Sequence, residues 1–142
     1  GTAAQGSITG FYAVLVEADD LNDPVGDTVR SILDGHVALS RDLAGKGHYP
    51  PIDILGSVSR VMNEVSSPNH IKWSHRFREL LSAYRDNEDL INIGAYVPGS
   101  SREVDTAIQL MPDFNRFLRQ GLKEAAPFAE TVNHLSQLVG NR

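Results

Sequence analysis

The nine residues ITGFYAVLV, at positions 8–16, are the first apolar run of the chain. β-Branched and aromatic residues are frequent in the run, and no polar side chain interrupts residues 13–16. Strands that are buried on both faces, as in a parallel sheet, have this composition. An isolated strand of this kind would leave unpaired backbone groups at its edges. The run therefore predicts a strand of an α/β domain and disfavours a self-standing helical scaffold.

The residues after this run predict a helix and a second strand. Pro24 suits the first turn of a helix. Apolar residues recur at helical spacing up to Leu33, which predicts a helix over residues 24–34. Gly35 should end that helix, and residues 36–40 read as a short strand. Strand, helix and strand in succession predict a βαβ unit with a right-handed crossover.

The second half of the chain predicts helices only. Residues 45–51 are a loop by composition, a turn of helix is expected within residues 52–62, and Ser66-Ser67-Pro68 marks a boundary. Ser100 and Glu103 form a capping box. Four helices are expected beyond the boundary, near residues 68–86, 88–95, 101–118 (with a kink at Pro112) and 127–139. The chain thus predicts the tail end of an α/β domain followed by a small helical domain.

Composition excludes several kinds of protein. The chain has 142 residues, 41% hydrophobic and 22% charged, which is ordinary for a globular domain. It has no cysteine, so disulfides, thiolate catalysis and zinc–sulfur sites are excluded. No apolar run approaches the roughly 18 residues that a transmembrane helix needs. The net charge of −5 lies in residues 1–66, so we expect no nucleic-acid partner. The first residue is Gly1, and we expect a piece of a longer protein.

Motifs for independent catalysis are missing from the sequence. No Gly-x-x-x-x-Gly-Lys-Ser/Thr loop occurs, so the chain carries no phosphate-binding P-loop. His70 and His75 are five residues apart, which does not place two imidazoles on one face of a helix. His36 and His48 have no carboxylate at ligand spacing, and we expect solvated or capping histidines and no metal site.

Four motifs occur in one order: GSIT at residues 6–9, ADDLNDP at 18–24, Tyr-Pro at 49–50 and SVSR at 57–60. This series resembles the catalytic subunits of the rotary ATP synthases and their relatives. The stretches GSITGFYAVLVEADD, ILDGHVALSRDLA and EDLINIGAY are most similar to the export ATPases of flagella and injectisomes, the flagellar branch being the closer. The resemblance runs from Gly6 to about Leu138. Where the synthase subunit has a strongly acidic loop, this chain has VPGSSRE at residues 97–103.

The resemblance implies a fold class of α/β then all-α. Residues 1–66 would be the C-terminal part of a RecA-like parallel-sheet nucleotide-binding domain, and residues 67–142 a C-terminal helical domain. The cofactor would be ATP with Mg²⁺, held mainly by groups upstream of Gly1. We therefore expect the 142-residue chain by itself to hydrolyse no ATP at a useful rate.

Arg60 closes the SVSR motif, and the resemblance implies that it is an arginine finger. Such an arginine leaves its own subunit and meets the nucleotide phosphates of the neighbour. A planar guanidinium suits the charge that develops on phosphoryl oxygens. The alternative is a surface arginine paired with an acidic neighbour such as Glu64.

The resemblance also implies half of an adenine pocket. Tyr49 and Pro50 would form a platform, because an aromatic ring offers a stacking face to any base. An ungapped alignment on Arg-Phe-Leu at residues 116–118 implies a second wall, made by Leu122, Ala125 and Phe128. Leu122 replaces an aromatic residue there. The alternative for Leu122 and Phe128 is ordinary core packing.

The expected function is that of a ring-forming ATPase, a hexamer, which energises flagellar (type III) protein export. The expected partners are export chaperone–substrate complexes, stalk and regulator proteins and the membrane export gate. The expected location is the cytoplasm, peripheral to the inner membrane. Two alternatives stay open: a fragment of a rotary ATP synthase subunit, and a non-catalytic docking module for chaperones and stalk proteins.

Overall fold

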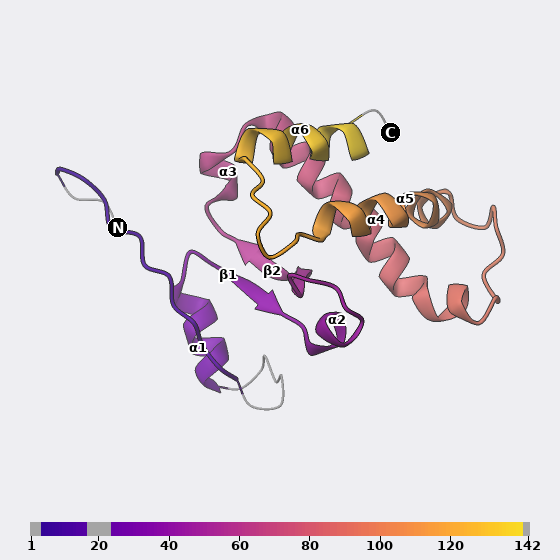
Figure 1. The fold of residues 1–142 in the computed structure, drawn as a ribbon, viewed down its shortest axis with the longest axis horizontal. Coiled ribbons are helices and arrows are strands. Elements are labelled where there is room, and N and C mark those ends of the chain that lie inside the picture. Colours follow the sequence, from indigo (N-terminus) through magenta and orange to yellow (C-terminus); the bar gives the residue numbers. More distant parts are fainter. Residues whose placement is uncertain (1–3, 17–23, 141–142) are drawn as a thin grey trace. The chain divides into compact units, whose positions relative to one another are not determined.

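The computed structural model describes residues 4–16 and 24–140, without the side chain of Val25. The chain forms two compact units, residues 1–33 and residues 34–142 (Figure 1). The division of the chain at residue 66 stays a prediction.

In the first unit, the helix expected at residues 24–34 is confirmed as α1, Pro24–Ile32. The strand expected over residues 8–16 is wrong: this segment has no regular secondary structure. Its large side chains lie in solvent, with Phe11 94% and Leu15 98% exposed. A strand depends on ladder hydrogen bonds to a neighbour, and no described segment pairs with this one. The described part of the chain therefore contains no βαβ unit.

The second unit begins with two strands, β1 at Gly35–Leu39 and β2 at Ile52–Ser59, joined through α2 at Arg41–Gly45. β1 confirms the short strand that was expected one residue later. β2 was not predicted, and it occupies the segment where a turn of helix was expected. The helical turn, α3, follows at Met62–Val65. The two strands pair antiparallel, because a reversal of the chain separates them.

Gly35 does not close α1 but opens β1, where the two strands come close together. A Cβ atom on Gly35 would lie 2.5 Å from the carbonyl oxygen of Val58. That distance is far inside van der Waals contact, so only glycine fits there without a shift of the strands. The pairing of Gly35 with Ser59 depends on this close approach.

The ladder between β1 and β2 is interrupted by a bulge. His36 pairs with Val58 and Ala38 pairs with Asp53, so one residue of β1 lies opposite residues 54–57 of β2. We call residues 54–57 the β2 bulge. Bulged residues leave the ladder and bend the strand, so their backbone groups need partners elsewhere.

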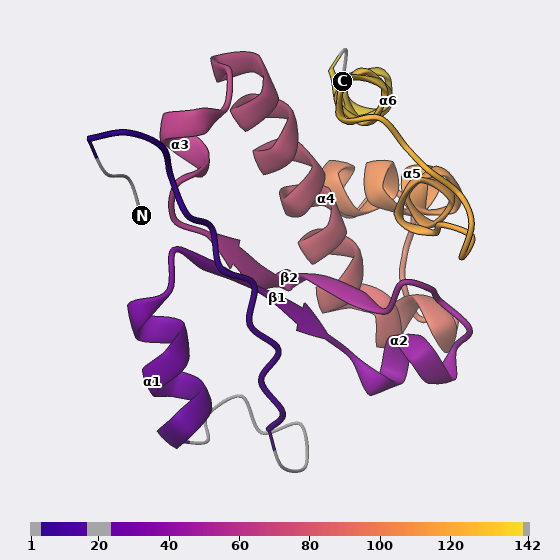
Figure 2. The same cartoon turned by 60° about the vertical axis from the view of Figure 1, so that its left-hand side comes forward.

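Three helices complete the unit: α4 at Pro68–Asn92, α5 at Arg102–Leu118 and α6 at Phe128–Val139. Figure 2 shows α4 in the middle, with the strands on one side of it and α5 and α6 on the other. The core lies between the helices, with the rings of Phe77 and Phe114 4.2 Å apart. The buried core residues are Phe77, Leu80, Leu81, Ala107, Leu110, Phe114, Leu135, Leu138 and Val139.

Two helix predictions need correction. The helices expected at 68–86 and 88–95 are one helix, because no glycine or proline interrupts the chain between them. α5 is capped by Ser101, whose Oγ accepts a hydrogen bond from the Val104 amide, and not by Ser100. Glu103 accepts from Arg76 of α4 at 2.7 Å in place of closing a capping box. α5 continues through Pro112.

Among the described residues, no helix is both long enough and apolar enough to cross a bilayer. The longest, α4, has a strongly polar composition.

Candidate nucleotide site

Arg60 follows the last residue of β2 and is exposed. Its amide donates a hydrogen bond of 2.8 Å to the carbonyl oxygen of Asp34, the residue before β1. This bond extends the pairing of the two strands by one step, so the backbone at Arg60 is held at the end of the strand pair. The side chain therefore starts from a fixed position.

Tyr49 and Pro50 precede the other end of β2 and are joined by a cis peptide bond. The side chain of Tyr49 is 56% exposed, while its carbonyl oxygen accepts a 3.0 Å hydrogen bond from the Gln120 amide. Gln120 belongs to the segment after α5. The expected aromatic platform is thus connected to the helical part of the chain through its own backbone.

The segment after α5 folds into a tight turn around Glu124. The Glu124 amide donates to the carbonyl oxygen of Gly121 at 3.0 Å, and the Glu124 carboxylate accepts from the Gly121 amide at 2.8 Å. The Gln120 side-chain amide donates to the Glu124 carbonyl oxygen at 2.8 Å. We call residues 119–124 the 119–124 turn. Its internal bonds fix its shape, and the bond from the Gln120 amide to Tyr49 holds it beside Tyr49.

Tyr49 and the 119–124 turn border an open cleft of about 590 Å³. The volume suits a small ligand. The residues that line it are Gly47, Tyr49, Pro112, Asn115, Arg116, Arg119, Gln120, Gly121 and Glu124. They provide one aromatic ring, two amide side chains, two guanidinium groups and one carboxylate.

This set of side chains suits a planar heteroaromatic ligand. The exposed ring of Tyr49 offers a stacking face, and Asn115 and Gln120 each carry both a donor and an acceptor. Arg116 is engaged at 3.1 Å by Asp113. The residues present therefore fit the base of a nucleotide, which would be stacked on Tyr49 and hydrogen-bonded by the amides.

The three residues of the expected second wall do not line this cleft. Leu122 is fully exposed, and Ala125 is also exposed. Phe128 is 74% exposed and meets the ring of His70 edge-on, with the ring centroids 5.9 Å apart. Neither Leu122 nor Phe128 belongs to the buried core, which was the alternative for both. Their role at adenine stays a prediction.

The cleft contains residues that the sequence reasoning missed, above all Gln120 and Glu124. A signal for them exists in the sequence: a glycine directly after a long amphipathic pattern, with a glutamate three residues on, indicates a tight turn. The sequence could not indicate that this turn packs on Tyr49, because more than 60 residues separate the two.

His48 was expected to be a solvated or capping histidine; it is not solvated, and its hydrogen bond to the backbone of Leu118, the last residue of α5, agrees with the capping alternative. The His48 side chain is buried, with 6% exposed, directly before Tyr49. Burial lowers the pKa of His48, and the nearby charge of Arg119 lowers it further, while a hydrogen bond to the backbone of Leu118 acts in the opposite direction. The neutral imidazole is therefore the form that the fold favours beside the cleft.

The part of the chain that the structure describes has no cluster of metal-ligating side chains beside the cleft. No group of three or more histidine or carboxylate side chains among the described residues could hold a metal ion. The presence of Mg²⁺ in the whole protein stays a proposal.

The two predicted functional positions lie at opposite ends of one strand. Tyr49 comes just before β2, and Arg60 directly follows it. A regular strand of eight residues is about 26 Å long, and the β2 bulge shortens this somewhat. The aromatic platform and the arginine are thus well separated within one chain, which suits contact with two different nucleotides.

Family models cover both parts of the chain. The model described as the T3SS EscN ATPase C-terminal domain matches residues 66–137. The model described as the ATP synthase alpha/beta family nucleotide-binding domain matches residues 1–59. The fold is therefore the C-terminal part of a nucleotide-binding domain followed by a helical domain.

Relatives are similar over nearly the whole chain. A flagellum-specific ATP synthase of Bacillus subtilis is 52% identical over 99% of this chain and 32% of its own length. A type 3 secretion system ATPase of Pseudomonas savastanoi is 48% identical over 98% of this chain and 31% of its own. This chain thus spans about a third of the length of the curated relatives it matches.

Solved structures agree with these relatives. The assembled ATPase EscN of the enteropathogenic E. coli type III secretion system superposes with a TM-score of 0.92 at 42% identity, over 97% of this chain and 34% of that one. EscN in complex with its central stalk EscO gives a TM-score of 0.87 at 39% identity, over 97% and 32%. The chain therefore belongs to the flagellar and type III secretion ATPases of the ATP synthase alpha/beta superfamily.

Proposed function

We propose that this chain is the C-terminal part of a ring-forming ATPase that energises flagellar, type III protein export. The observation that carries the proposal is the placement of Tyr49 and Arg60 at opposite ends of β2. A subunit in a ring can then stack its own nucleotide on Tyr49 and reach the next subunit's nucleotide with Arg60. Residues 1–66 would complete the nucleotide-binding domain, and residues 67–142 would form the helical domain.

Arg60 would supply positive charge at the phosphates of the neighbouring subunit's ATP. Charge that develops on phosphoryl oxygens is stabilised by a guanidinium held in place beforehand, because no reorganisation is then needed during the reaction. The hydrogen bond from the Arg60 amide to the Asp34 carbonyl oxygen supports this, since it holds the backbone from which the side chain extends. Arginine fingers contribute roughly 10³–10⁵ in rate in other systems.

Tyr49 would hold the base of the subunit's own ATP. The bond between its carbonyl oxygen and the Gln120 amide brings the helical domain to the base, so both domains would contribute to one cleft. When bound, Mg²⁺ would neutralise phosphate charge and orient the phosphates. Its ligands would come from outside the described residues.

The test is a mixing experiment with the full-length protein. One variant carries Arg60→Ala, and a second carries a disabled phosphate-binding loop with Arg60 intact. If Arg60 acts across a subunit boundary, mixed rings contain interfaces that combine an intact loop with an intact arginine. ATP turnover of the mixture should then exceed the sum of the two separate variants.

The control for this mixture is a double variant that carries both changes in one subunit. Mixing it with wild-type subunits lowers the number of interfaces that combine an intact loop with an intact arginine, and creates no new interface of this kind. A mixture of the two single variants that stays at their summed turnover would contradict an arginine acting between subunits.

The exposed connection between α4 and α5 supports a second role, in docking. Ile93 is 75% exposed and Val97 66% exposed, on the segment of residues 93–101. EscN was solved in complex with its central stalk EscO, and we propose that a stalk protein contacts this segment in the ring. Export chaperones, regulator proteins and the membrane export gate are further proposed partners, at a cytoplasmic position against the inner membrane.

This docking role is tested by Val97→Asp in the full-length protein. Binding of the purified stalk protein should weaken while ATP turnover without the stalk stays unchanged. Unchanged stalk affinity would place the stalk contact elsewhere.

A further inference from the structure

The β2 bulge, which lies before the last two ladder residues and Arg60, is held mainly by side chains of other elements. Residues 54–57 leave the ladder with β1, so their carbonyl groups lack strand partners. Backbone carbonyls that are removed from water need hydrogen bonds, because an unpaired one costs free energy. The partners of the β2 bulge therefore decide its shape.

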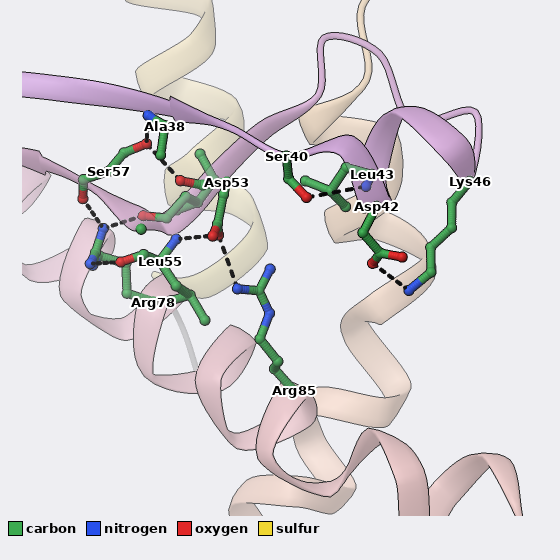
Figure 3. A network of polar contacts seen from close by, with 12 residues as sticks. Ala38, Ser40, Asp42, Leu43, Lys46, Asp53, Leu55, Ser57, Arg78 and Arg85 are labelled. Atoms are coloured by element: carbon green, nitrogen blue, oxygen red, sulfur yellow. Dashed lines mark hydrogen bonds and ion pairs between the residues drawn. The ribbon is translucent and has the colours of Figure 1, made fainter. Parts of the chain in front are cut away.

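Arg78 of α4 binds three of these carbonyl groups (Figure 3). Its Nη1 donates to the carbonyl oxygens of Ile54 at 2.5 Å and Ser57 at 3.2 Å, and its Nη2 donates to that of Leu55 at 3.2 Å. Donors on a charged group form stronger hydrogen bonds than neutral donors. One planar guanidinium thus defines the relative positions of three residues of the bulge.

Further contacts complete the bulge. The imidazole of His36 hydrogen-bonds the carbonyl oxygen of Gly56 at 2.9 Å, and Arg85 of α4 pairs with the Asp53 carboxylate at 2.9 Å. The same carboxylate oxygen accepts from the Leu55 amide at 3.1 Å. The side chains of Ile54 and Leu55 pack against the helical core. Figure 3 shows Arg78 and Arg85 reaching the strand from one helix.

The bulge is adjacent to the arginine. Ser57, the last residue held by Arg78, is three residues before Arg60, and Val58 and Ser59 return to the ladder with His36 and Gly35. A shift of the bulge along β2 changes where the strand re-enters the ladder. Since Arg60 directly follows the ladder, its side chain would shift with it.

We propose that Arg78 is a positioning residue, which sets the place of Arg60 by holding the β2 bulge to helix α4. The inference rests on the proposed role of Arg60 as a finger. The hydrogen bonds of Arg78 described above all go to backbone carbonyl oxygens of its own chain. A displacement of a reacting group by about 1 Å can cost on the order of a hundredfold in rate, so the effect of Arg78 falls on turnover.

The test uses the full-length protein with Arg78→Gln and Arg78→Lys. Glutamine can reach one carbonyl at most, and we expect kcat to fall between about tenfold and a hundredfold, with KM for ATP changed less than twofold. Lysine keeps the charge and three donors on one nitrogen, but it lacks the planar fork. Arg78→Lys should therefore recover part of kcat, between glutamine and wild type.

Arg76→Gln is the matched control. Arg76 lies on the same helix, and its guanidinium pairs with Glu79 and Glu103 within the helical part of the chain. Its loss should lower the melting temperature without a selective fall in kcat. Equal kcat losses in Arg76→Gln and Arg78→Gln, at equal melting temperatures, would overturn the proposal and indicate general destabilisation.

A double-variant cycle distinguishes the positioning role of Arg78 from the finger role of Arg60. If Arg78 acts through Arg60, adding Arg78→Gln to Arg60→Ala should lower kcat no further. Independent, multiplicative losses would overturn the positioning role while leaving the finger intact. Wild-type turnover in Arg60→Ala would instead overturn the proposed function itself. Should Arg78→Gln fail to fold, Arg78→Lys in the same cycle gives the decision.

Discussion

The two ends of β2 are held in different ways. At the Tyr49 end, the helical part of the chain comes directly to the site: the 119–124 turn bonds the Tyr49 backbone and borders the cleft. At the Arg60 end, the residue is exposed, and Arg78 of the helical part bonds the β2 bulge, three to six residues before Arg60. The Tyr49 end borders an open cleft lined by other segments of the same chain, whereas the exposed Arg60 end is supported through its backbone.

This difference indicates how one chain can serve two sites. The Tyr49 end would hold a ligand of the same subunit, because the lining of its cleft comes from the same chain. An exposed end is suited to a site completed by another molecule, provided that its backbone is fixed. Variants at the two ends should therefore differ: a variant at Arg60 should lose turnover, and a variant at Tyr49 should lose affinity for ATP.

The largest expected effect is that of Arg60→Ala in the full-length protein. Removing a charge that acts on the phosphates in the transition state should lower kcat by roughly 10³-fold, with little loss of nucleotide affinity. Steady-state ATPase assays with a parallel measurement of nucleotide binding check this. Equal losses in turnover and affinity would indicate a structural arginine and remove the contrast between the two ends.

A smaller effect is expected from Tyr49→Ala. Loss of the stacking face should raise KM for ATP by about tenfold to a hundredfold, as expected from stacking worth roughly 1–3 kcal/mol per base. kcat should change much less, because the base is remote from the reacting bonds. Tyr49→Phe keeps the ring and should behave like wild type; a large rise of KM in that variant would assign the effect to the hydroxyl group.

Glu124→Ala tests whether the 119–124 turn contributes to nucleotide binding at the Tyr49 end of β2. Its carboxylate accepts from the Gly121 amide, and loss of one such bond costs about 0.5–1.5 kcal/mol. If the turn borders the bound base, KM should rise by about two- to tenfold at unchanged kcat. The control is Glu130→Ala, an exposed residue at the start of α6. A lowered kcat in Glu124→Ala would link the turn to the chemistry instead.

The smallest effect is a pH dependence of stability from His48. Its pKa in the folded protein is below the ordinary value of about 6.5, mainly because the side chain is buried. The unfolded chain then binds a proton at a higher pH than the folded one. Stability from this group is complete above about pH 6.5 and declines as the pH falls from there through the lower pKa of the folded state.

Melting curves of wild type and His48→Gln between pH 7.5 and 5 measure this effect. The wild type should lose more stability over this range than the variant. Parallel pH profiles of the two proteins would show that His48 does not contribute to the loss of stability in acid.

The sequence anticipated some elements of both ends and missed others. The Tyr-Pro and SVSR motifs gave the two positions that we propose to be functional, and apolar residues at helical spacing predicted the first part of α4, because helical periodicity is a local property. β2 was missed because its sequence, IDILGSVS, mixes polar residues and glycine into the run. Gly56 and Ser57 belong to the bulge, which does not follow the alternation of a regular strand.

The strand expected at residues 8–16 failed for a related reason. Its composition is that of a buried strand, and Phe11 and Leu15 are nevertheless exposed. Apolar composition describes the environment in which a segment is stable, but pairing partners decide whether a strand forms. No described segment of the chain supplies such a partner.

The sequence by itself determined the family and indicated a helical second half, although it divided α4 into two helices, and its motifs gave the two positions that carry the proposed function. These features depend on residue identity and on spacing within short segments. Only the tertiary structure decided that the 119–124 turn meets Tyr49 and that Arg78 holds the carbonyl groups of the β2 bulge. The physical reason is that backbone groups are chemically the same in every residue, so no sequence pattern states which distant side chain will bind them.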